Sequence, residues 1–210
     1  MVFCLSKQQT EWGIGLIKVT ELIEAKDLTS GAICFSDKRD KVGKWYERIF
    51  TFFQKKLTPG NTHISFIFPQ ENKIMCLEAT MPKVQMSELK SALSLERNSR
   101  KIYLIKNWDL KDFKSMCYML YNEFKDVKYG LMQAIFIPLA RFFKVKNIFG
   151  LSKKKQVCSE FVLNGFLRSK YRELFIDLKK IEDKIIPQDI MDRIKAWLYF
   201  DNMELIERID

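Results

Sequence analysis

The sequence predicts an α+β fold, with a small antiparallel sheet and helices packed at one side of it. Short apolar stretches with alternating side chains, which are typical of strands, concentrate in the first half of the chain, and apolar residues at helical spacing dominate the second half. The 210 residues are 47% hydrophobic and include only 8 Gly and 5 Pro, which is enough for a core and argues against disorder. No linker or internal repeat divides the chain, so residues 1–210 are expected to form a single domain.

The first elements differ in how clearly the pattern defines them. Residues 14–25, IGLIKVTELIEA, are compatible with a helix or a strand. After a turn, the short apolar run at 32–35 predicts a buried strand. Residues 44–57 carry large apolar residues at helical spacing, and the turn residues at 58–61 end this predicted helix.

A β-hairpin is the clearest local prediction, because residues 63–79 read HISFIF–PQEN–KIMCLEA, with alternating side chains on both arms. A four-residue loop, 69–72, pairs residues whose numbers sum to 141, and it sets His63 directly opposite Glu78. Such a pair has Cβ atoms roughly 4.5–5.5 Å apart. A five-residue loop would set Ala79 opposite instead, so the arrangement depends on the loop length.

The second half continues with one further strand and then helices. Residues 101–106 predict a strand, and 109–125 predict a helix with an Asp N-cap. Its apolar face would consist of Phe113, Met116, Cys117, Leu120 and Phe124. We expect a buried helix at 131–143, a helix that begins near Cys158 and runs to about residue 168, and a last helix at 188–199 that follows a proline.

The charge balance allows two interpretations. The chain has 36 Lys and Arg against 26 Asp and Glu, a net charge of +10. This excess suggests an anionic partner, such as a nucleic acid, a lipid surface or an acidic polymer, but scattered lysines that solvate a Phe-rich chain are the favoured explanation. The sequence shows no motif of a nucleic-acid-binding fold, so charge alone identifies no partner.

No targeting or membrane-spanning segment is apparent. The N-terminal apolar stretch is too short for a secretory signal. The longest mostly apolar run, 131–143, is interrupted by polar residues, and a spanning helix needs roughly 20 apolar residues. We therefore expect a soluble cytoplasmic or intracellular protein, and a phage, a virus or an exported effector would all be compatible sources.

The cysteines do not predict a metal site. There are five of them without CxxC spacing, and the chain has a single His, which argues against a zinc site of the usual Cys/His kind. Reduced thiols in a reducing compartment are expected, and most of them should pack as small apolar side chains. No cofactor is predicted.

One cysteine has the surroundings of a reactive thiol. Cys158 stands at the predicted start of a helix and follows the run Lys153–Lys155, and both features favour the thiolate. An attacking thiol needs a base, and His63 is the one histidine available. That imidazole in turn needs an acceptor, which the predicted hairpin supplies as Glu78. Each residue alone has an ordinary structural explanation, so the hypothesis depends on all three together.

The order of these residues resembles a known family. His63 in THISFIF, Glu78 in CLEAT, Tyr129 in KYGLM and Cys158 in QVCSEFV follow the order seen in circularly permuted NlpC-type papain-like hydrolases, and the chain is similar to their YiiX-like branch. A later PQDI at 187–190 is similar to the P-x-D-I of that family. The stretch GAICF resembles the family's opening G-D-I strand, but an alanine replaces the usual Asp. The resemblance covers roughly residues 28–190, with extensions at both ends.

The resemblance implies a papain-like fold, in which the helix that carries the Cys packs on a small barrel-like antiparallel sheet. It implies thiol chemistry on amide, ester or thioester bonds, with Cys158 as nucleophile, His63 as base and then acid, and Glu78 as the acceptor that orients the ring. Tyr129 and Ser159 are candidates for contacts with the substrate or the oxyanion. The backbone N–H of Cys158 is a further oxyanion donor if it begins a helix.

Three functions remain open at the level of sequence. The first is a cysteine hydrolase or acyltransferase, an amidase, peptidase, esterase or thioesterase that forms a covalent acyl-thiol intermediate on a peptide, amide or lipid-acyl substrate. The alternative is a basic, non-catalytic binding module for nucleic acid or an anionic membrane surface, which has the net charge of +10 as its main support. The third is a protein that handles acyl groups at a membrane, with residues 131–143 as a peripheral contact.

Overall fold

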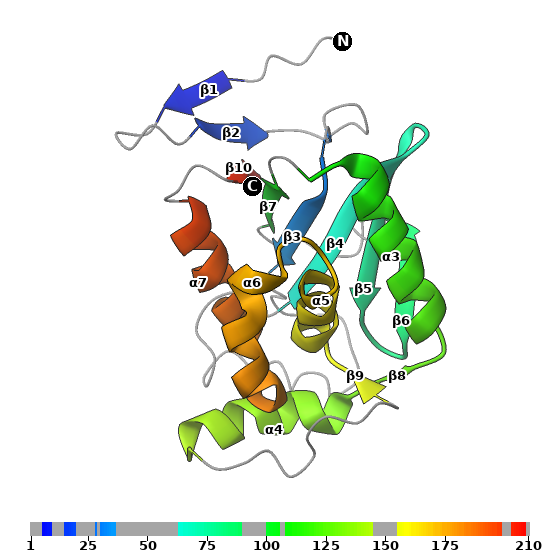
Figure 1. Ribbon diagram of the computed structural model, residues 1–210, viewed down its shortest axis with the longest axis vertical. Helices are drawn as coiled ribbons and strands as arrows, with labels where there is room; N and C mark the ends of the chain where they lie inside the picture. Colours follow the sequence, from blue (N-terminus) through cyan, green and yellow to red (C-terminus); the bar gives the residue numbers. More distant parts are fainter. Residues whose placement is uncertain are drawn as a thin grey trace.

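An eight-stranded sheet forms the frame of the protein (Figure 1). The computed structural model describes residues 6–9, 15–19, 28, 30–36, 63–89, 100–105, 108–144, 155–198 and 203–208. The strands are β1 (Ser6–Gln9), β2 (Gly15–Val19), β3 (Ala32–Ser36), β4 (His63–Gln70), β5 (Lys73–Ala79), β6 (Val84–Glu88), β7 (Arg100–Ile105) and β10 (Met203–Arg208). Their order across the sheet is β1-β2-β10-β7-β3-β4-β5-β6. All neighbours are antiparallel except β2 and β10, which are parallel.

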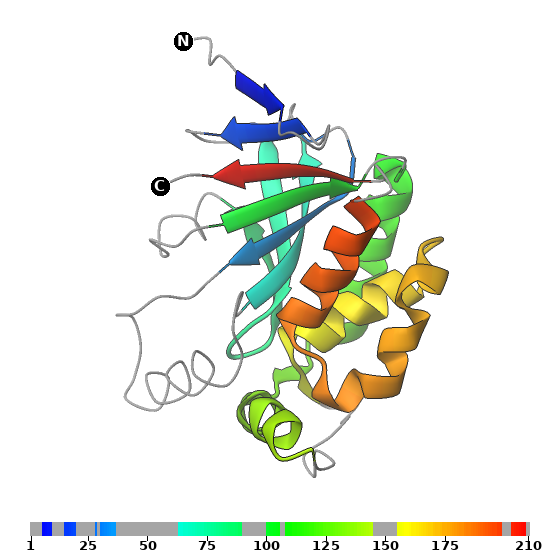
Figure 2. The ribbon, with the colours of Figure 1, turned by 90° about the vertical axis from the view of Figure 1, so that its left-hand side faces the viewer.

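Helices cover one face of this sheet (Figure 2). They are α3 (Leu110–Phe124), α5 (Cys158–Leu167), α6 (Arg172–Phe175), the 3₁₀ helix η2 (Ile176–Lys184) and α7 (Pro187–Leu198). A further helix, α4 (Leu131–Phe142), lies at one end of the molecule, below the sheet in Figure 1. A parallel pair of two-residue strands, β8 (Lys128–Tyr129) and β9 (Lys155–Gln156), connects the start of α4 with the start of α5.

The α+β class and most element predictions are confirmed. The strands expected at 32–35 and 101–106 are β3 and β7, the helices expected at 109–125, near 158 and at 188–199 are α3, α5 and α7, and the ambiguous segment 14–25 contains the strand β2. The sheet is larger than the small antiparallel sheet that was predicted, because β1, β2 and β10 extend it and introduce a parallel pair. The helix expected at 44–57 lies outside the described residues.

The predicted register of the hairpin is wrong. The ladder between β4 and β5 runs from Phe66 paired with Leu77 to Gln70 paired with Lys73, so partner numbers sum to 143 rather than 141. The connection is a two-residue turn instead of a four-residue loop, and its first residue, Glu71, has a φ of 53°. Two-residue turns with a positive φ match the right-handed twist of the flanking strands, which favours this shorter connection. The ladder ends before it reaches residue 63.

The predicted start of α3 is confirmed in detail. The carboxylate of Asp109 accepts hydrogen bonds from the backbone N–H groups of Lys111, at 2.9 Å, and Asp112, at 3.1 Å. This is the N-cap arrangement that satisfies two of the otherwise unpartnered donors of a helix start. The five apolar residues expected on one face of this helix are all buried.

Aromatic packing fixes α5 against the sheet. The ring of Phe66 on β4 makes edge or tilted contacts with Phe113 of α3 and with Phe161 and Phe166 of α5. Gly165 lies directly against the same ring, and a Cβ atom at this position would come within 2.6 Å of it. The absence of a side chain at Gly165 therefore allows the close approach of α5 to β4.

The helix at 131–143 is less buried than predicted. One side of α4 packs on the protein and includes Ala134, Ile137 and Pro138, but the outer side is exposed. Among the residues that the structure describes, no helix has the length and apolar character needed to cross a membrane.

Candidate active site

Two of the predicted site residues are in direct contact. His63 is the first residue of β4 and Glu78 lies near the end of β5. The Nε2 atom of His63 lies 2.6 Å from the Oε2 atom of Glu78, and 7% and 13% of these side chains are exposed. The contact therefore exists although the hairpin register differs from the predicted one. In the observed register His63 and Glu78 are not paired in the ladder, and they meet where the strands extend beyond it.

Gln85 holds the carboxylate of Glu78 from the other side. Its Nε2 atom donates to Oε1 of Glu78 at 3.1 Å, and the two residues are directly opposite each other on β5 and β6. One oxygen of Glu78 thus binds the imidazole and the other binds an amide, so the carboxylate has a defined orientation. Sequence reasoning missed Gln85. A four-residue connection at 80–83, which pairs Ala79 with Val84, would have placed Gln85 opposite Glu78.

Cys158 acts on the same imidazole from a third segment of the chain. Burial of the ring disfavours its charged form, but the negative charge and hydrogen bond of Cys158, together with the hydrogen bond and charge of Glu78, outweigh this effect and raise the pKa of His63 from 6.5 to about 9. The structure thus brings together Cys158, His63 and Glu78, three residues that the sequence nominated from separate positions. The ring lies between a thiol and a carboxylate.

The position of Cys158 at a helix start is confirmed. It is the first residue of α5, it is buried, and the preceding residue, Val157, has an extended backbone and provides no side-chain cap. The first intrahelical hydrogen bond runs from the N–H of Phe161 to the carbonyl of Val157, at 2.9 Å. The N–H groups at such a start have no intrahelical acceptor, and they carry the positive end of the helix dipole. Of the expected cations, Lys155 is exposed on β9, and the other two lie outside the described residues.

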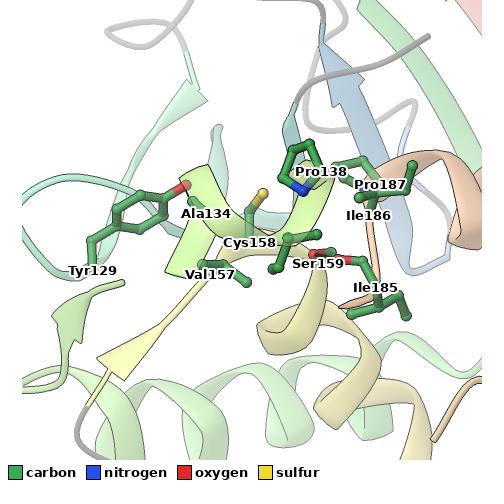
Figure 3. A pocket seen from close by; sticks show the side chains of 10 residues that line it. Tyr129, Ala134, Pro138, Val157, Cys158, Ser159, Ile185, Ile186 and Pro187 are labelled. Atoms are coloured by element: carbon green, nitrogen blue, oxygen red, sulfur yellow. Dashed lines mark hydrogen bonds between the residues drawn. The ribbon is translucent and has the colours of Figure 1, made fainter. Parts of the chain in front are cut away.

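Tyr129 borders the same site from β8. Burial, and then the negative charges of Cys158, Glu160 and Glu78, raise the pKa of its hydroxyl well above 10. Figure 3 shows the hydroxyl end of Tyr129 turned toward the side chain of Cys158. The phenol therefore stays protonated at neutral pH and is a hydrogen-bond donor beside the sulfur.

The neighbours of Cys158 in the sequence have structural contacts. The hydroxyl of Ser159 donates to the backbone carbonyl of Ile185 at 2.8 Å, so its single proton is engaged in a contact that braces α5 against the segment before α7. This geometry favours a structural role for Ser159 over the predicted contact with an oxyanion. Glu160 is almost completely buried and accepts a hydrogen bond from the side-chain amide of Gln133, which ties α4 to α5.

The PQDI segment also has a structural role. Asp189 accepts hydrogen bonds from the backbone N–H of Ile186, at 2.9 Å, and from the guanidinium of Arg141. The same guanidinium contacts the backbone carbonyl of Lys184. These bonds connect the end of α4 with the start of α7.

A mostly apolar pocket opens beside the thiol (Figure 3). The space inside it, including its open mouth, amounts to about 340 Å³. Its lining consists of Tyr129, Ala134, Ile137, Pro138, Val157, Cys158, Ser159, Ile185, Ile186 and Pro187. Cys158 thus lies at the edge of a small hollow with a mostly apolar lining. In the part of the chain that the structure describes, no three His, Cys, Asp or Glu side chains are grouped so that they could hold a metal ion.

Comparisons with known proteins do not assign the chain to a family. No model of a known protein family matches the chain, and a search of the curated proteins gives no match. The assignment of a function therefore depends on the geometry of the site.

Proposed function

We propose that this chain is a cysteine hydrolase or acyltransferase, which uses Cys158 as the nucleophile, His63 as the base and Glu78 as the group that orients the base. The observation that carries the proposal is the imidazole of His63, which contacts Glu78 at 2.6 Å and responds to the charge of Cys158. Thiol, imidazole and carboxylate in this order are the parts of an activated sulfur nucleophile. The order of the motifs further supports a papain-like enzyme that is similar to the YiiX-like branch of the circularly permuted NlpC-type hydrolases.

The roles of the two ring nitrogens follow from the contact with Glu78. Because Nε2 donates to this carboxylate, Nδ1 is the nitrogen left to exchange a proton with the sulfur. The proton moves from Sγ of Cys158 to Nδ1, and the carboxylate stabilises the imidazolium that results. A pKa of about 9 means that the His63 ring carries the proton at neutral pH.

The chemical steps are those of acyl transfer. The thiolate of Cys158 attacks the carbonyl carbon of an amide, ester or thioester, and the carbonyl electron pair moves to the oxygen. When the tetrahedral intermediate collapses, the bond to the leaving group breaks, and His63 gives its proton to that group. Water, or a second acceptor deprotonated by the same imidazole, then attacks the acyl-thiol and releases Cys158.

Two donors are available for the oxyanion. The backbone N–H of Cys158 points out of the start of α5, and the protonated hydroxyl of Tyr129 is turned toward the sulfur (Figure 3). The apolar lining of the adjacent pocket favours acyl groups with an apolar portion over strongly charged ones.

The test is to trap the acyl-enzyme. The protein is mixed with an activated ester, such as p-nitrophenyl butyrate, quenched in acid and mapped by mass spectrometry. We expect a single acyl adduct on Cys158, and brief treatment with iodoacetamide at neutral pH should modify the same residue first. Cys117 is the matched control, because it is fully buried and burial raises its pKa. Faster labelling of Cys117, or an unchanged adduct in Cys158→Ala, would assign the nucleophile elsewhere.

His63→Ala provides the second part of the test. The chain has no other histidine that could replace this base. Loss of a general base lowers the rate of acyl transfer by about 10²–10⁴-fold. A variant that keeps its circular dichroism spectrum and an acylation rate within a few-fold of the wild type would contradict the proposed pair.

A further inference from the structure

The outer side of α4 presents bulky apolar side chains to solvent. Phe142 and Phe143, at the end of the helix, are 68% and 64% exposed, and Met132, near its start, is exposed as well. The two phenyl rings pack edge to face, with their centroids 5.1 Å apart. They are the most exposed of the large apolar side chains that the structure describes. We call Met132, Phe142 and Phe143 the α4 outer face. Adjacent exposed aromatic residues of this kind mark an interaction site.

The sequence around this face carries charge of one sign. Between Asp126 and Glu160 the chain contains no acidic residue, and it contains seven of the 36 Lys and Arg. They are Lys128, Arg141, Lys144, Lys146 and the run Lys153–Lys155. Arg141 is engaged by Asp189, but Lys144 directly follows the two phenylalanines and is exposed. The net charge of +10 is therefore concentrated in the segment that includes the α4 outer face.

We propose that the α4 outer face docks on an anionic phospholipid bilayer. Aromatic side chains that enter the headgroup region, with lysines beside them, are the combination that holds a peripheral helix at an anionic membrane surface. A second copy of the chain fits less well, because a symmetric contact would bring the same positive segment against itself. The inner side of α4 is packed on the protein, so the helix would lie along the membrane.

Docking in this way places the candidate site close to lipid. Ala134, Ile137 and Pro138, on the inner side of α4, line the pocket beside Cys158. The pocket and the α4 outer face are therefore separated by about one helix diameter, roughly 10–12 Å. The proposal concerns binding alone and holds whether or not the thiol is catalytic.

The experiment is co-sedimentation of the full chain with vesicles. One set contains phosphatidylcholine with about a third phosphatidylserine, and the other contains phosphatidylcholine alone. We expect the wild type to bind the anionic vesicles and to lose this binding in high salt. The double variant Phe142→Ser/Phe143→Ser should bind the same vesicles with an apparent affinity that is at least about tenfold lower. Lys144→Glu should weaken binding several-fold.

Two matched variants control for fold and chemistry. Met119→Ser removes an apolar side chain that is 45% exposed on α3, and it should bind like the wild type. Cys158→Ala should also bind normally, which separates a failure of this proposal from a failure of the proposed enzyme activity. The inference is overturned if the wild type does not bind anionic vesicles or if the double variant binds equally well. It is also overturned if light scattering shows a dimer that the double variant dissociates without any vesicle binding.

Discussion

The titration of His63 is the most direct measure of the candidate site. The chain contains one histidine, so its ring resonances in an NMR spectrum belong to this residue without further assignment. We expect the ring to titrate with a pKa of about 9, well above the 6.5 of an ordinary histidine. Because thiol and imidazole interact, the measured value describes the pair of groups.

The size of the effect on stability follows from the same two values. They differ by about 2.5 pH units, and each unit corresponds to about 1.4 kcal/mol, so the protonated ring contributes about 3 kcal/mol to folding. The pKa is higher in the folded chain, so this contribution is fully present below pH 6.5 and is lost as the pH rises toward 9. The free energy of unfolding in urea should therefore be measured for the wild type and for His63→Asn. The difference between the two proteins should shrink by about 3 kcal/mol as the pH rises from about 6 to 10.

Two variants separate the causes of the raised pKa. Burial lowers the pKa, and Cys158 raises it more than Glu78 does. Cys158→Ala should therefore lower the pKa of His63 by about one unit or more, and Glu78→Gln should lower it by a smaller amount. Glu123→Gln is the control, because this carboxylate is exposed and paired with Arg168. A wild-type pKa near 6.5, or an equal value in Cys158→Ala, would refute the contact between thiol and imidazole.

The remaining predictions address the oxyanion, the hairpin turn and the placement of α5. Tyr129→Phe removes a hydroxyl donor and should lower the acylation rate by about 10²-fold while alkylation of Cys158 stays fast; an unchanged rate would leave Tyr129 a packing role. Glu71→Gly should raise the free energy of unfolding by about 0.5–1 kcal/mol in urea, because glycine adopts the φ of 53° without strain. Gly165→Ala should lower it by about 1–3 kcal/mol and reduce acylation, since the new Cβ would overlap the ring of Phe66; a stabilised, fully active variant would contradict this packing.

Local patterns predicted the elements well because their signals lie within a few residues. The N-cap of α3 and its buried face could be inferred directly, since an Asp precedes apolar residues at helical spacing. The hairpin arms were equally clear, but the register was not. It depends on whether Pro69 and Gln70 belong to the strand or to the loop, and the two-residue turn at Glu71 kept both in the strand. A positive φ at a glutamate leaves no signal in the sequence.

Some residues of the candidate site could be predicted from the sequence, and others could not. The types of residue that a thiol nucleophile needs could be nominated, because Cys158 and His63 are distinctive in a chain with a single histidine. Ser159 was a candidate for contact with the substrate or the oxyanion, but its hydroxyl donates to the backbone carbonyl of Ile185, and this contact depends on tertiary packing. Gln85 was missed because a glutamine on a strand has many uses, and only the pairing of β5 with β6 shows that it holds Glu78.

The meeting of Cys158 and His63 depends on a contact that neither residue makes. Gly165 and Phe66 touch where α5 crosses β4. From that contact, seven helical residues lead back to Cys158, a distance of about 10 Å at 1.5 Å per residue. Three strand residues lead back from Phe66 to His63, which is again about 10 Å at 3.3 Å per residue. The close packing at Gly165 therefore holds together the two elements that carry the thiol and the imidazole, at a point about 10 Å along each element from the reactive residue.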